Sequence, residues 1–512
     1  MFTTVKSYAL DGIDGFPIQV EVFSQKGLPS FDIVGLATSA VKESKERVRS
    51  AITNSGFEFG VHKTVINLAP ADIKKEWSSL DLPIAIGYLA AVGQIPYKNC
   101  GEYIFLGELS LDGSLRRING VMPLLLGAIQ EGYKKFIIPF DNAKEASFVH
   151  GAEVYALKNL EETVKLLIGL NIPPIATSYY ETDDDIFCEV DIGDIKGQSI
   201  AKRGLEIAVA GAHNMLMCGS PGTGKTMLAK CVTGIMPRMT FEEGIDITKI
   251  HSVAGLIMPE EGILKRRPFR SPHHTATLLS LTGGGIKVMP GEVSLAHNGV
   301  LFLDEMPEYN RKTLETLRQP LEDGKITITR VGKSVNYPAR FMLIASMNPC
   351  PCGYYGSSVK ECTCTQREIF QYVSKISGPL LDRIDIYVTV DNIEFSEFRS
   401  KQVAEDSKTV RSRIEKAREM QLKRFKNCGI YTNSQMNNSM IKRFCAIEKE
   451  SEYLLQRVFE SQKLSPRATT RILKIARTIA DLSGKEEIGF SDVAEAIEYK
   501  IVDKKELVTG WS

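Results

Sequence analysis

The sequence lacks a long apolar run. Its longest apolar stretches, Pro83 to Val92 and Met122 to Ile129, are well short of the roughly 18 apolar residues that a membrane-spanning helix requires. The first residues also lack a basic segment followed by an apolar one, which is the pattern of a secretory signal peptide. We therefore expect a soluble, cytoplasmic chain with no membrane partner.

The chain also has almost no net charge, because 63 Lys and Arg residues are balanced by 62 Asp and Glu. This balance excludes a polybasic nucleic-acid arm or an acidic tail as a description of the whole chain. A local excess appears only in residues 401–480, which contain 18 Lys or Arg against 8 Asp or Glu. Solvated helix faces are the ordinary explanation for such a run, and a surface near a polyanion is the alternative.

Cysteine is scarce, since ten in 512 residues are too few for a disulfide scaffold. Four of them cluster as Cys350-Pro-Cys352 and Cys362-Thr-Cys364. Four thiolates in two short arms can close a tetrahedral Zn²⁺ site, although this C-x-C spacing is tighter than the usual C-x-x-C. Full ligation leaves no open position, so we predict structural zinc; four reduced cysteines in a loop are the alternative.

Composition and periodicity divide the chain into segments, as expected for about three or four domains. Residues 1–172 alternate strand-like and helix-like stretches, and 173–191 combine a proline pair with an acidic run, which is typical of a linker. Residues 192–392 repeat an apolar strand, a glycine turn and a helix, as in a parallel α/β sheet. Residues 393–512 follow helical periodicity. In the first segment we expect strands at 18–23, 64–68, 103–106 and 136–138, and helices at 40–52 and 124–132.

A phosphate-binding motif lies in the third segment. The run that matches G-x-x-x-x-G-K-[ST] is Gly219, Ser220, Pro221, Gly222, Thr223, Gly224, Lys225 and Thr226. Glycines let backbone N–H groups close around phosphate oxygens, Lys225 supplies positive charge to the β- and γ-phosphates, and the Thr226 hydroxyl binds Mg²⁺. A strand at 214–218 and a helix at 227–232 are the context that the motif requires. We therefore predict an ATP and Mg²⁺ site.

A second apolar strand, at 299–303, ends in two carboxylates. Its composition suits a central buried strand, and Asp304 then emerges at the carboxyl edge, where open α/β sheets bind ligands. At this place Asp304 can hold Mg²⁺ and Glu305 can polarise the attacking water.

Together these motifs resemble those of AAA+ ATPases. Asn348, at the end of another strand, is similar in place to the sensor-1 residue, which implies a role in positioning water. Residues 377–385 resemble the arginine-finger segment, which makes Arg383 the candidate for contacting a neighbour's γ-phosphate. Residues 464–468 resemble the start of the sensor-2 helix, with Arg467 as a cis or trans phosphate contact. A trans-acting arginine implies a ring or filament.

Two additions to the ATPase core carry basic residues. Residues 251–297 include Arg266, Arg267 and Arg270, and 324–339 are predicted to form a β-hairpin. Near its tip lie Arg330 and Lys333. These additions resemble the helix-2 insert and pre-sensor-1 hairpin of the clade that holds magnesium-chelatase ATPase subunits and MCM helicases, which implies a DNA-gripping pore. An ordinary exposed hairpin is the alternative.

Nearly the whole chain is similar to the YifB/ComM family. The stretches that carry the resemblance are PFRSPHHTAT, PGEVSLAHNGVLFLDE, LEDGKITITR, MNPCPCGYYG and SGPLLDRIDI. The resemblance implies a cytoplasmic bacterial AAA+ ATPase, a hexameric helicase that drives branch migration of DNA during natural transformation. A remodelling chaperone or chelatase-type motor acting on a protein client is the alternative, although a dedicated chelatase motor is not expected to carry an N-terminal domain similar to Lon or the four-cysteine insert.

Residues 1–172 resemble the proteolytic domain of Lon, an α+β fold similar to ribosomal protein S5. Ser79 falls where Lon has its nucleophile, and a Ser–Lys enzyme needs a lysine amine to accept the serine proton. Met122 stands at the position of that lysine, and the next lysines, Lys134 and Lys135, lie about a helix further along. We therefore expect no peptidase activity, and binding of a partner, DNA or a neighbour in the ring instead.

Overall fold

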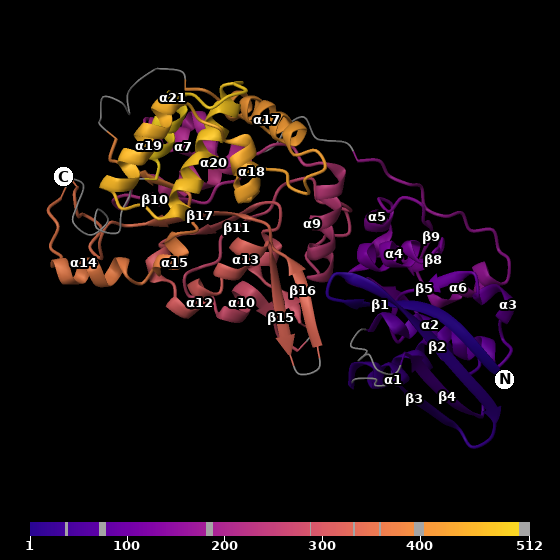
Figure 1. The fold of residues 1–512 in the computed structure, drawn as a ribbon. Helices are drawn as coiled ribbons and strands as arrows, with labels where there is room; N and C mark the ends of the chain where they lie inside the picture. Colours follow the sequence, from indigo (N-terminus) through magenta and orange to yellow (C-terminus); the bar gives the residue numbers. More distant parts are fainter. Residues whose placement is uncertain are drawn as a thin grey trace.

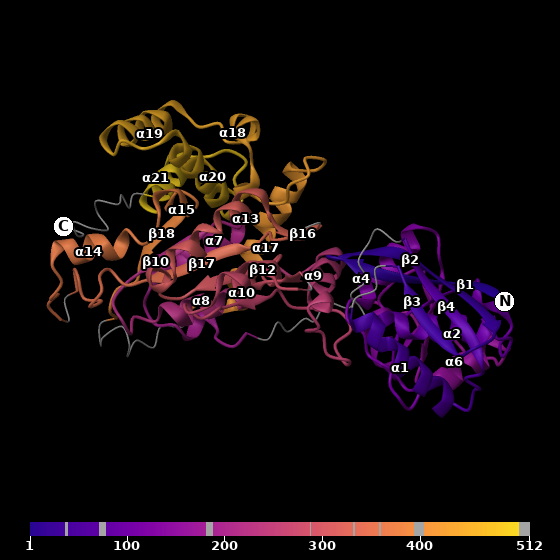
Figure 2. The same cartoon turned by 90° about the horizontal axis from the view of Figure 1, so that it is seen from below.

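The structure is a computed structural model, which describes residues 1–35, 39–70, 78–180, 188–286, 288–330, 333–357, 360–393 and 404–500. An N-terminal α/β unit lies beside a larger unit that combines a parallel sheet with a cap of helices (Figures 1 and 2). Among the described residues, no helix combines the length and apolar character needed to cross a membrane.

The N-terminal unit is built on a seven-stranded mixed sheet with the order β3-β4-β2-β1-β5-β8-β9. Its strands are β1 (Phe2–Asp11), β2 (Asp14–Lys26), β3 (Ser30–Val34), β4 (His62–Ala69), β5 (Tyr103–Phe105), β8 (Lys135–Pro139) and β9 (Glu153–Leu157), with a separate pair β6 (Glu108–Leu109) and β7 (Leu115–Arg116). Its helices are α1 (Ser39–Asn54), α2 (Asp81–Ala91), α3 (Tyr97–Cys100), α4 (Val121–Gln130), α5 (Ala143–Ala146) and α6 (Leu160–Leu167). The α+β prediction for this unit and its expected strands are confirmed.

Helix α4 begins earlier than the sequence suggested. The prediction placed its start at residue 124, directly after Pro123, whereas the helix begins at Val121. Proline is tolerated in the first turn of a helix, because the N–H that it lacks has no intrahelical partner there. The true start follows Gly120, whose φ of 75° lies in the left-handed region.

The larger unit contains a five-stranded sheet with the order β11-β14-β17-β10-β18, and all its neighbours are parallel. The strands are β10 (Met215–Cys218), β11 (Phe269–Arg270), β14 (Val300–Leu303), β17 (Met342–Met347) and β18 (Ile386–Thr389). Around them lie α7 (Ser199–Gly211), α8 (Lys225–Ile235), α9 (Phe241–Val253), α10 (Leu278–Thr282), α11 (Glu292–Leu295), α12 (Arg311–Glu315), α13 (Arg318–Asp323), α14 (Gln366–Val373) and α15 (Gly378–Leu381), with a short pair β12 (Gly283–Gly284) and β13 (Met289–Pro290). Every residue of β10, β14 and β17 is buried, as expected for central parallel strands.

The predicted hairpin is also present, as β15 (Lys325–Arg330) and β16 (Lys333–Pro338). It forms a two-stranded sheet of its own in which Arg330 and Lys333 are cross-strand partners. The two residues between them lie outside the described part of the chain.

The C-terminal helices form a lid on the sheet (Figure 2). They are α17 (Ser407–Arg424), α18 (Asn438–Phe444), α19 (Lys449–Ser461), α20 (Pro466–Leu482) and α21 (Phe490–Glu498). One apolar cluster joins sheet residues such as Met217 and Ile344 to lid residues such as Ile475 and Ile479. The helical prediction is confirmed for 407–498, while 394–403 and 501–512 lie outside the described residues.

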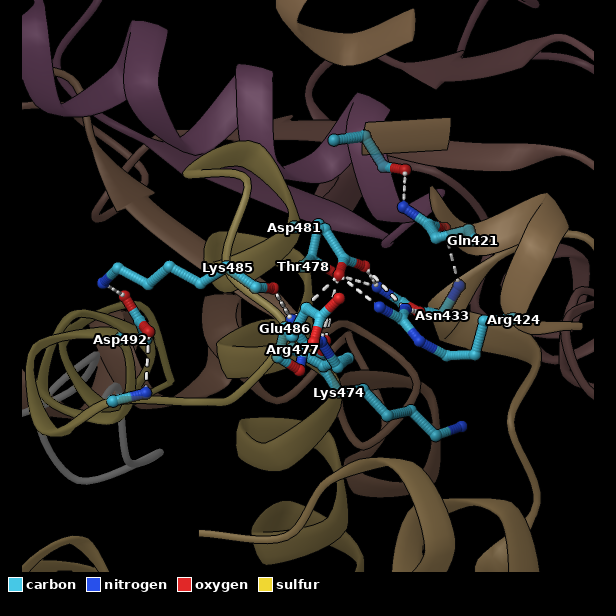
Figure 3. A network of polar contacts seen from close by, with 12 residues as sticks. Gln421, Arg424, Asn433, Lys474, Arg477, Thr478, Asp481, Lys485, Glu486 and Asp492 are labelled. Carbon is cyan, nitrogen blue, oxygen red and sulfur yellow. Dashed lines mark hydrogen bonds and ion pairs between the residues drawn. The ribbon is translucent and has the colours of Figure 1, made fainter. Parts of the chain in front are cut away.

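Arginines of residues 401–480 form ion pairs within the chain, among them Arg413, Arg424 and Arg477. Arg424 and Arg477 both hold the Asp481 carboxylate, whose side chain is fully buried, and Figure 3 shows these groups converging. Arg413 pairs with Glu206 and Glu405. These contacts favour a structural role for the local excess over a polyanion-binding face.

The free energy of unfolding is expected to depend on pH because His297 is buried. Burial lowers the pKa of His297 to about 4, against about 6.5 in an unfolded chain. The unfolded state therefore binds one more proton between these values, so the stability from neutral His297 is complete above pH 6.5 and is lost as pH falls. We expect this residue to remove about 1.4 kcal/mol of unfolding free energy between pH 7.5 and 5.5.

The comparison of wild type with His297→Gln in urea unfolding at pH 7.5, 6.5 and 5.5 checks this expectation. Other titrating groups contribute equally to both proteins, so the difference isolates His297. The stability gap between wild type and variant should narrow as pH falls. A gap that stays constant with pH contradicts the prediction.

Candidate active site

The phosphate loop follows the carboxyl end of β10 and runs directly into α8. Gly222 and Gly224 have φ values of 82° and 90°, and a Cβ at either position would meet nothing within 4 Å. Glycine is therefore required there by backbone conformation, which other residues adopt with strain, rather than by crowding. Gly224 is also the N-cap of α8, so the loop presents a helix N-terminus, which is a favourable place for an anion.

Lys225 and Asn348 lie together at this loop. The Lys225 Nζ donates to the carbonyl oxygens of Gly219 and Ser220 at 2.7 and 2.9 Å and to Asn348 Oδ1 at 3.2 Å. Burial lowers the pKa of Lys225. The three hydrogen-bond acceptors of Lys225 are neutral, so a phosphate bound here would supply the negative charge that stabilises its buried ammonium group.

Asp304 and Thr226 meet at the same edge. The Thr226 hydroxyl donates to Asp304 Oδ2 at 3.0 Å, and the Ser346 hydroxyl donates to Asp304 Oδ1. A hydroxyl beside a carboxylate is the oxygen-rich arrangement that Mg²⁺ favours. These residues therefore fit a magnesium ion bound together with a nucleotide.

Ser346 is a functional neighbour that the sequence analysis missed. Its hydroxyl also accepts a hydrogen bond from the Glu305 backbone N–H at 3.1 Å. Glu305 has a φ of 51°, in the left-handed region, which costs a residue with a side chain about 1–2 kcal/mol. The contact with Ser346 helps to hold this conformation, and it ties both acidic residues to one side chain.

Arg383 and Arg467 converge on one carboxylate. The Arg383 Nη1 donates to the Pro379 carbonyl at 2.7 Å, and its Nη2 binds Glu322. Arg467 Nη2 lies 3.5 Å from the other oxygen of Glu322. Hydrogen bonding and charge from Arg383, with a smaller contribution from Arg467, lower the pKa of Glu322.

In the described part of the chain, neither arginine hydrogen-bonds to the phosphate loop. Arg383 and Glu322 instead line an open pocket of about 790 Å³ that also borders α10 and β15. The sequence analysis assigned Arg383 to a neighbour's γ-phosphate and Arg467 to a cis or trans phosphate contact, and within one chain the structure brings both to Glu322. Glu322 carries no sequence signal of its own.

The position of Arg467 depends on the anchoring of α20. Near the end of this helix, Asp481 accepts hydrogen bonds from Arg424 Nη1 at 2.8 Å, Asn433 Nδ2 at 2.8 Å and Arg477 Nε at 3.0 Å, as drawn in Figure 3. Thr478, also on α20, lies 2.9 Å from His213 at the end of α7. This contact fixes α20 to the segment between α7 and β10.

The four clustered cysteines lie together directly after β17. Their Sγ atoms all lie within 4.8 Å of one another, and three of the pairs are separated by 3.3, 3.6 and 3.6 Å. A tetrahedral site with Zn–S bonds near 2.3 Å separates its sulfurs by about 3.8 Å. Burial opposes ionisation of Cys352, but hydrogen bonds from neighbouring backbone N–H groups outweigh it and lower the pKa of its thiol to about 6. The cluster therefore fits a metal ion.

Two of the predicted DNA-contact arginines are committed to contacts within the chain. All five N–H donors of Arg267 are used, by Glu243 and by three backbone carbonyl oxygens. Arg270 forms a two-pronged pair with Glu292 at 2.6 and 2.7 Å. Arg266 is exposed. We therefore do not retain Arg267 as a DNA contact, because its guanidinium has no donor left for a phosphate.

In the N-terminal unit, Ser79 and Met122 are both buried, Met122 completely. Close to Ser79 in sequence, Asp81 is held by Arg47 at 2.9 Å. Lys135 is bound to Glu102 at 2.7 Å. Of the two lysines that follow Met122 in the sequence, Lys135 is therefore already engaged in an ion pair.

Comparisons with known proteins match sequences related to magnesium chelatase along the chain. Three family models match in order: "Subunit ChlI of Mg-chelatase" at residues 20–142, "Magnesium chelatase, subunit ChlI" at 191–398, and its C-terminal model at 404–500. A partial match, 29% identical over 162 residues and covering 29% of each chain, is to Lon protease 2 of Bacillus subtilis.

Several relatives match over almost their whole length, among them a competence protein and a YifB protein. The competence protein ComM of Haemophilus influenzae is 41% identical over 502 residues, which cover 97% of each chain. The protein YifB of Escherichia coli is 41% identical over 504 residues, covering 98% of this chain and 97% of its own. With a phosphate loop, paired acids and a parallel sheet in one unit, the chain belongs to the YifB/ComM family of magnesium-chelatase-like AAA+ ATPases.

Proposed function

We propose that this protein is an ATP-hydrolysing motor that assembles into a ring, most simply a hexamer, and moves branched DNA, as in branch migration during natural transformation. The observation that carries the ATPase part is the set of contacts at one sheet edge: Thr226 donates to Asp304, Ser346 contacts both Asp304 and the Glu305 backbone, and Lys225 of the phosphate loop contacts Asn348. One relative is named a competence protein, which supports a task in DNA handling.

ATP and Mg²⁺ would be held by the phosphate loop. The loop amides and Lys225 would bind the β- and γ-phosphates, and Thr226 and Asp304 would hold the metal. Mg²⁺ supplies positive charge against the developing phosphate charge. Glu305 orients and polarises the attacking water, and Asn348 positions it from the neighbouring strand. Ser346 keeps Asp304 and Glu305 in fixed relation.

The arginines favour a ring over a monomer. Arg383 and Arg467 both bind Glu322, and among the described residues neither hydrogen-bonds to the phosphate loop of its own chain. An arginine finger that acts on a neighbour's nucleotide makes each site complete only at a subunit boundary. Identical boundaries repeated by rotation close into a ring.

The hairpin tip supports DNA as the client. Arg330 and Lys333 are register partners at the last described pair of the hairpin, so the sequence puts two basic residues at its tip. Basic residues are the residue type that binds a phosphate backbone, because such contacts release condensed counterions. The exposed Arg266 is a further candidate contact.

Single substitutions in the hairpin test the DNA client. Arg330→Ala or Lys333→Ala should weaken binding to a four-way junction by a similar factor for every DNA sequence. Each should also reduce the slope of the logarithm of the binding constant against the logarithm of salt concentration by about one. The matched control is Lys325→Ala, which removes an exposed cation at the hairpin base, where Lys325 pairs with Pro338. Equal binding by tip and base variants, or ATPase activity that responds to a protein client and not to DNA, contradicts the DNA assignment and favours a remodelling chaperone.

We further propose that the cysteine cluster holds structural Zn²⁺. Purified protein should contain about one zinc per chain, and Cys362→Ser should lose it and melt at lower temperature, because metal binding contributes directly to folding. Elemental analysis and thermal unfolding measure both effects. Cys428→Ser, which removes a partly buried cysteine outside the cluster, should keep its zinc; equal zinc content in the two variants contradicts the site.

A further inference from the structure

One turn of the N-terminal unit touches the basic hairpin. Strands β1 and β2 are joined by Gly12 and Ile13, since Asp11 and Asp14 are the last register partners. Figure 1 shows this turn beside β16. Ile13 packs against apolar residues of both the N-terminal core and the core beneath the hairpin. The turn is therefore a bridge between the two units.

The contact at this bridge is close enough to require glycine. Gly12 has a φ of 66°, and a Cβ built on it would lie 2.5 Å from Val335 Cγ1, a distance that real contacts do not reach. The next atoms would be Val335 Cβ at 3.8 Å and the Asn336 carbonyl oxygen at 4.0 Å, which are ordinary contacts. A single methyl group of β16 thus fills the space beside Gly12.

The hairpin depends on such packing for its position. A two-stranded sheet is marginally stable by itself, and β15 and β16 pair only with each other among the described strands. One face is buried through Ile326, Val335 and Tyr337, and the Tyr337 hydroxyl donates to the Val288 carbonyl at 2.6 Å. Val335 is two residues from Lys333, so the turn supports the hairpin close to its basic tip.

The N-terminal unit offers a firm base for this support because it is joined to α9 elsewhere. The Gly120 backbone N–H donates to both the carbonyl and the hydroxyl oxygen of Ser252, at 3.1 and 3.0 Å. The Ser252 hydroxyl in turn donates to Glu145, which is buried in the N-terminal unit. Val253 and Ile263 are buried within the N-terminal core. The turn is therefore held at a fixed distance from the ATPase unit.

We propose that Gly12 and Ile13 are positioning residues for the basic hairpin, so that the N-terminal unit acts as its support. Strands β15 and β16 then keep one place relative to the rest of the ATPase unit, and DNA bound at their basic end is coupled to the nucleotide site. The DNA part of this inference rests on the proposed function, whereas the support itself does not.

A double-mutant cycle in the full-length protein tests the support. Gly12→Ala adds the clashing methyl, Val335→Ala removes the methyl that it meets, and the third variant combines them. Gly93→Ala is the matched control, because its φ of 82° imposes similar backbone strain while a Cβ there meets nothing within 4 Å. Ile13→Ala removes the apolar anchor with no such strain.

Hydrogen exchange of residues 325–338 is the first readout, and it needs no DNA. We expect Gly12→Ala and Ile13→Ala to speed exchange there by about tenfold, with Gly93→Ala unchanged. In the Val335→Ala background, adding Gly12→Ala should have little further effect, because coupled sites are not additive. Equal exchange in Gly12→Ala and Gly93→Ala, or full additivity in the cycle, overturns the support.

ATPase rates with and without a four-way junction are the second readout. Gly12→Ala should keep the basal rate and lose at least about two-thirds of the stimulation by DNA, and Ile13→Val should restore wild-type behaviour where Ile13→Ala does not. Normal stimulation in Gly12→Ala overturns the coupling. An absence of stimulation in wild type as well counts against the proposed function, and the exchange data then decide the support separately.

Discussion

Glu305→Gln is expected to bind ATP and assemble as wild type does, but to hydrolyse ATP about 10²–10³-fold more slowly. The glutamine side chain has the same size as glutamate, and the hydrogen bond from the backbone N–H at this position to Ser346 remains. The amide cannot polarise the attacking water as a carboxylate does. Phosphate loop and metal contacts are left untouched, so nucleotide affinity should be preserved. Steady-state hydrolysis and ATP binding, measured on the same preparation, separate the two steps.

The control for this variant is Glu308→Gln. Glu308 lies three residues away and pairs with Lys375 at the surface at 3.5 Å, so its loss should leave the rate within about twofold, as surface substitutions usually do. Full-rate hydrolysis by Glu305→Gln contradicts the role given to Glu305. A loss of ATP binding together with turnover indicates instead that Glu305 supports the site structurally.

Arg383→Ala is expected to lower the rate of the assembled protein by about 10³–10⁵-fold, the range for loss of an arginine finger. Lys225→Ala should also be inactive, because it removes the cation of the phosphate loop. Because the two residues act on different sides of a subunit boundary, a mixture of the two inactive proteins should recover activity. In an equal, random mixture, about one subunit boundary in four combines an intact phosphate loop on one side with an intact Arg383 on the other.

The control for mixing is Arg457→Ala, which removes an exposed arginine of α19 and should keep wild-type activity alone. Recovery should also require time for subunits to exchange. A mixture of Lys225→Ala and Arg383→Ala that stays inactive under exchange places Arg383 in the same subunit's site and contradicts the ring.

The local parts of the site could be predicted from the sequence. The phosphate loop is one continuous stretch, and its strand and helix carry their own apolar patterns, so Lys225 and Thr226 could be placed directly. The paired acids were found in the same way, because a buried strand ends at Leu303 and the next two residues are acidic. The hairpin was predictable because its two strands are adjacent in the chain.

Residues that act across strands or units could not be predicted in this way. Ser346 reaches Asp304 because the register pairs Leu303 with Ala345, and no local pattern fixes that register. Glu322 meets Arg383 only through tertiary packing, 61 residues away along the chain. No local pattern marks Gly12, because its tight contact with Val335 depends on how two separate cores meet.

The most direct test of the central claim is the ATPase rate of the wild-type protein with and without a four-way DNA junction, at low and at moderate salt. We expect the junction to stimulate hydrolysis at low salt and the stimulation to fall steeply as salt rises, because phosphate contacts release counterions. A rate that is the same with and without the junction in both conditions contradicts a DNA motor.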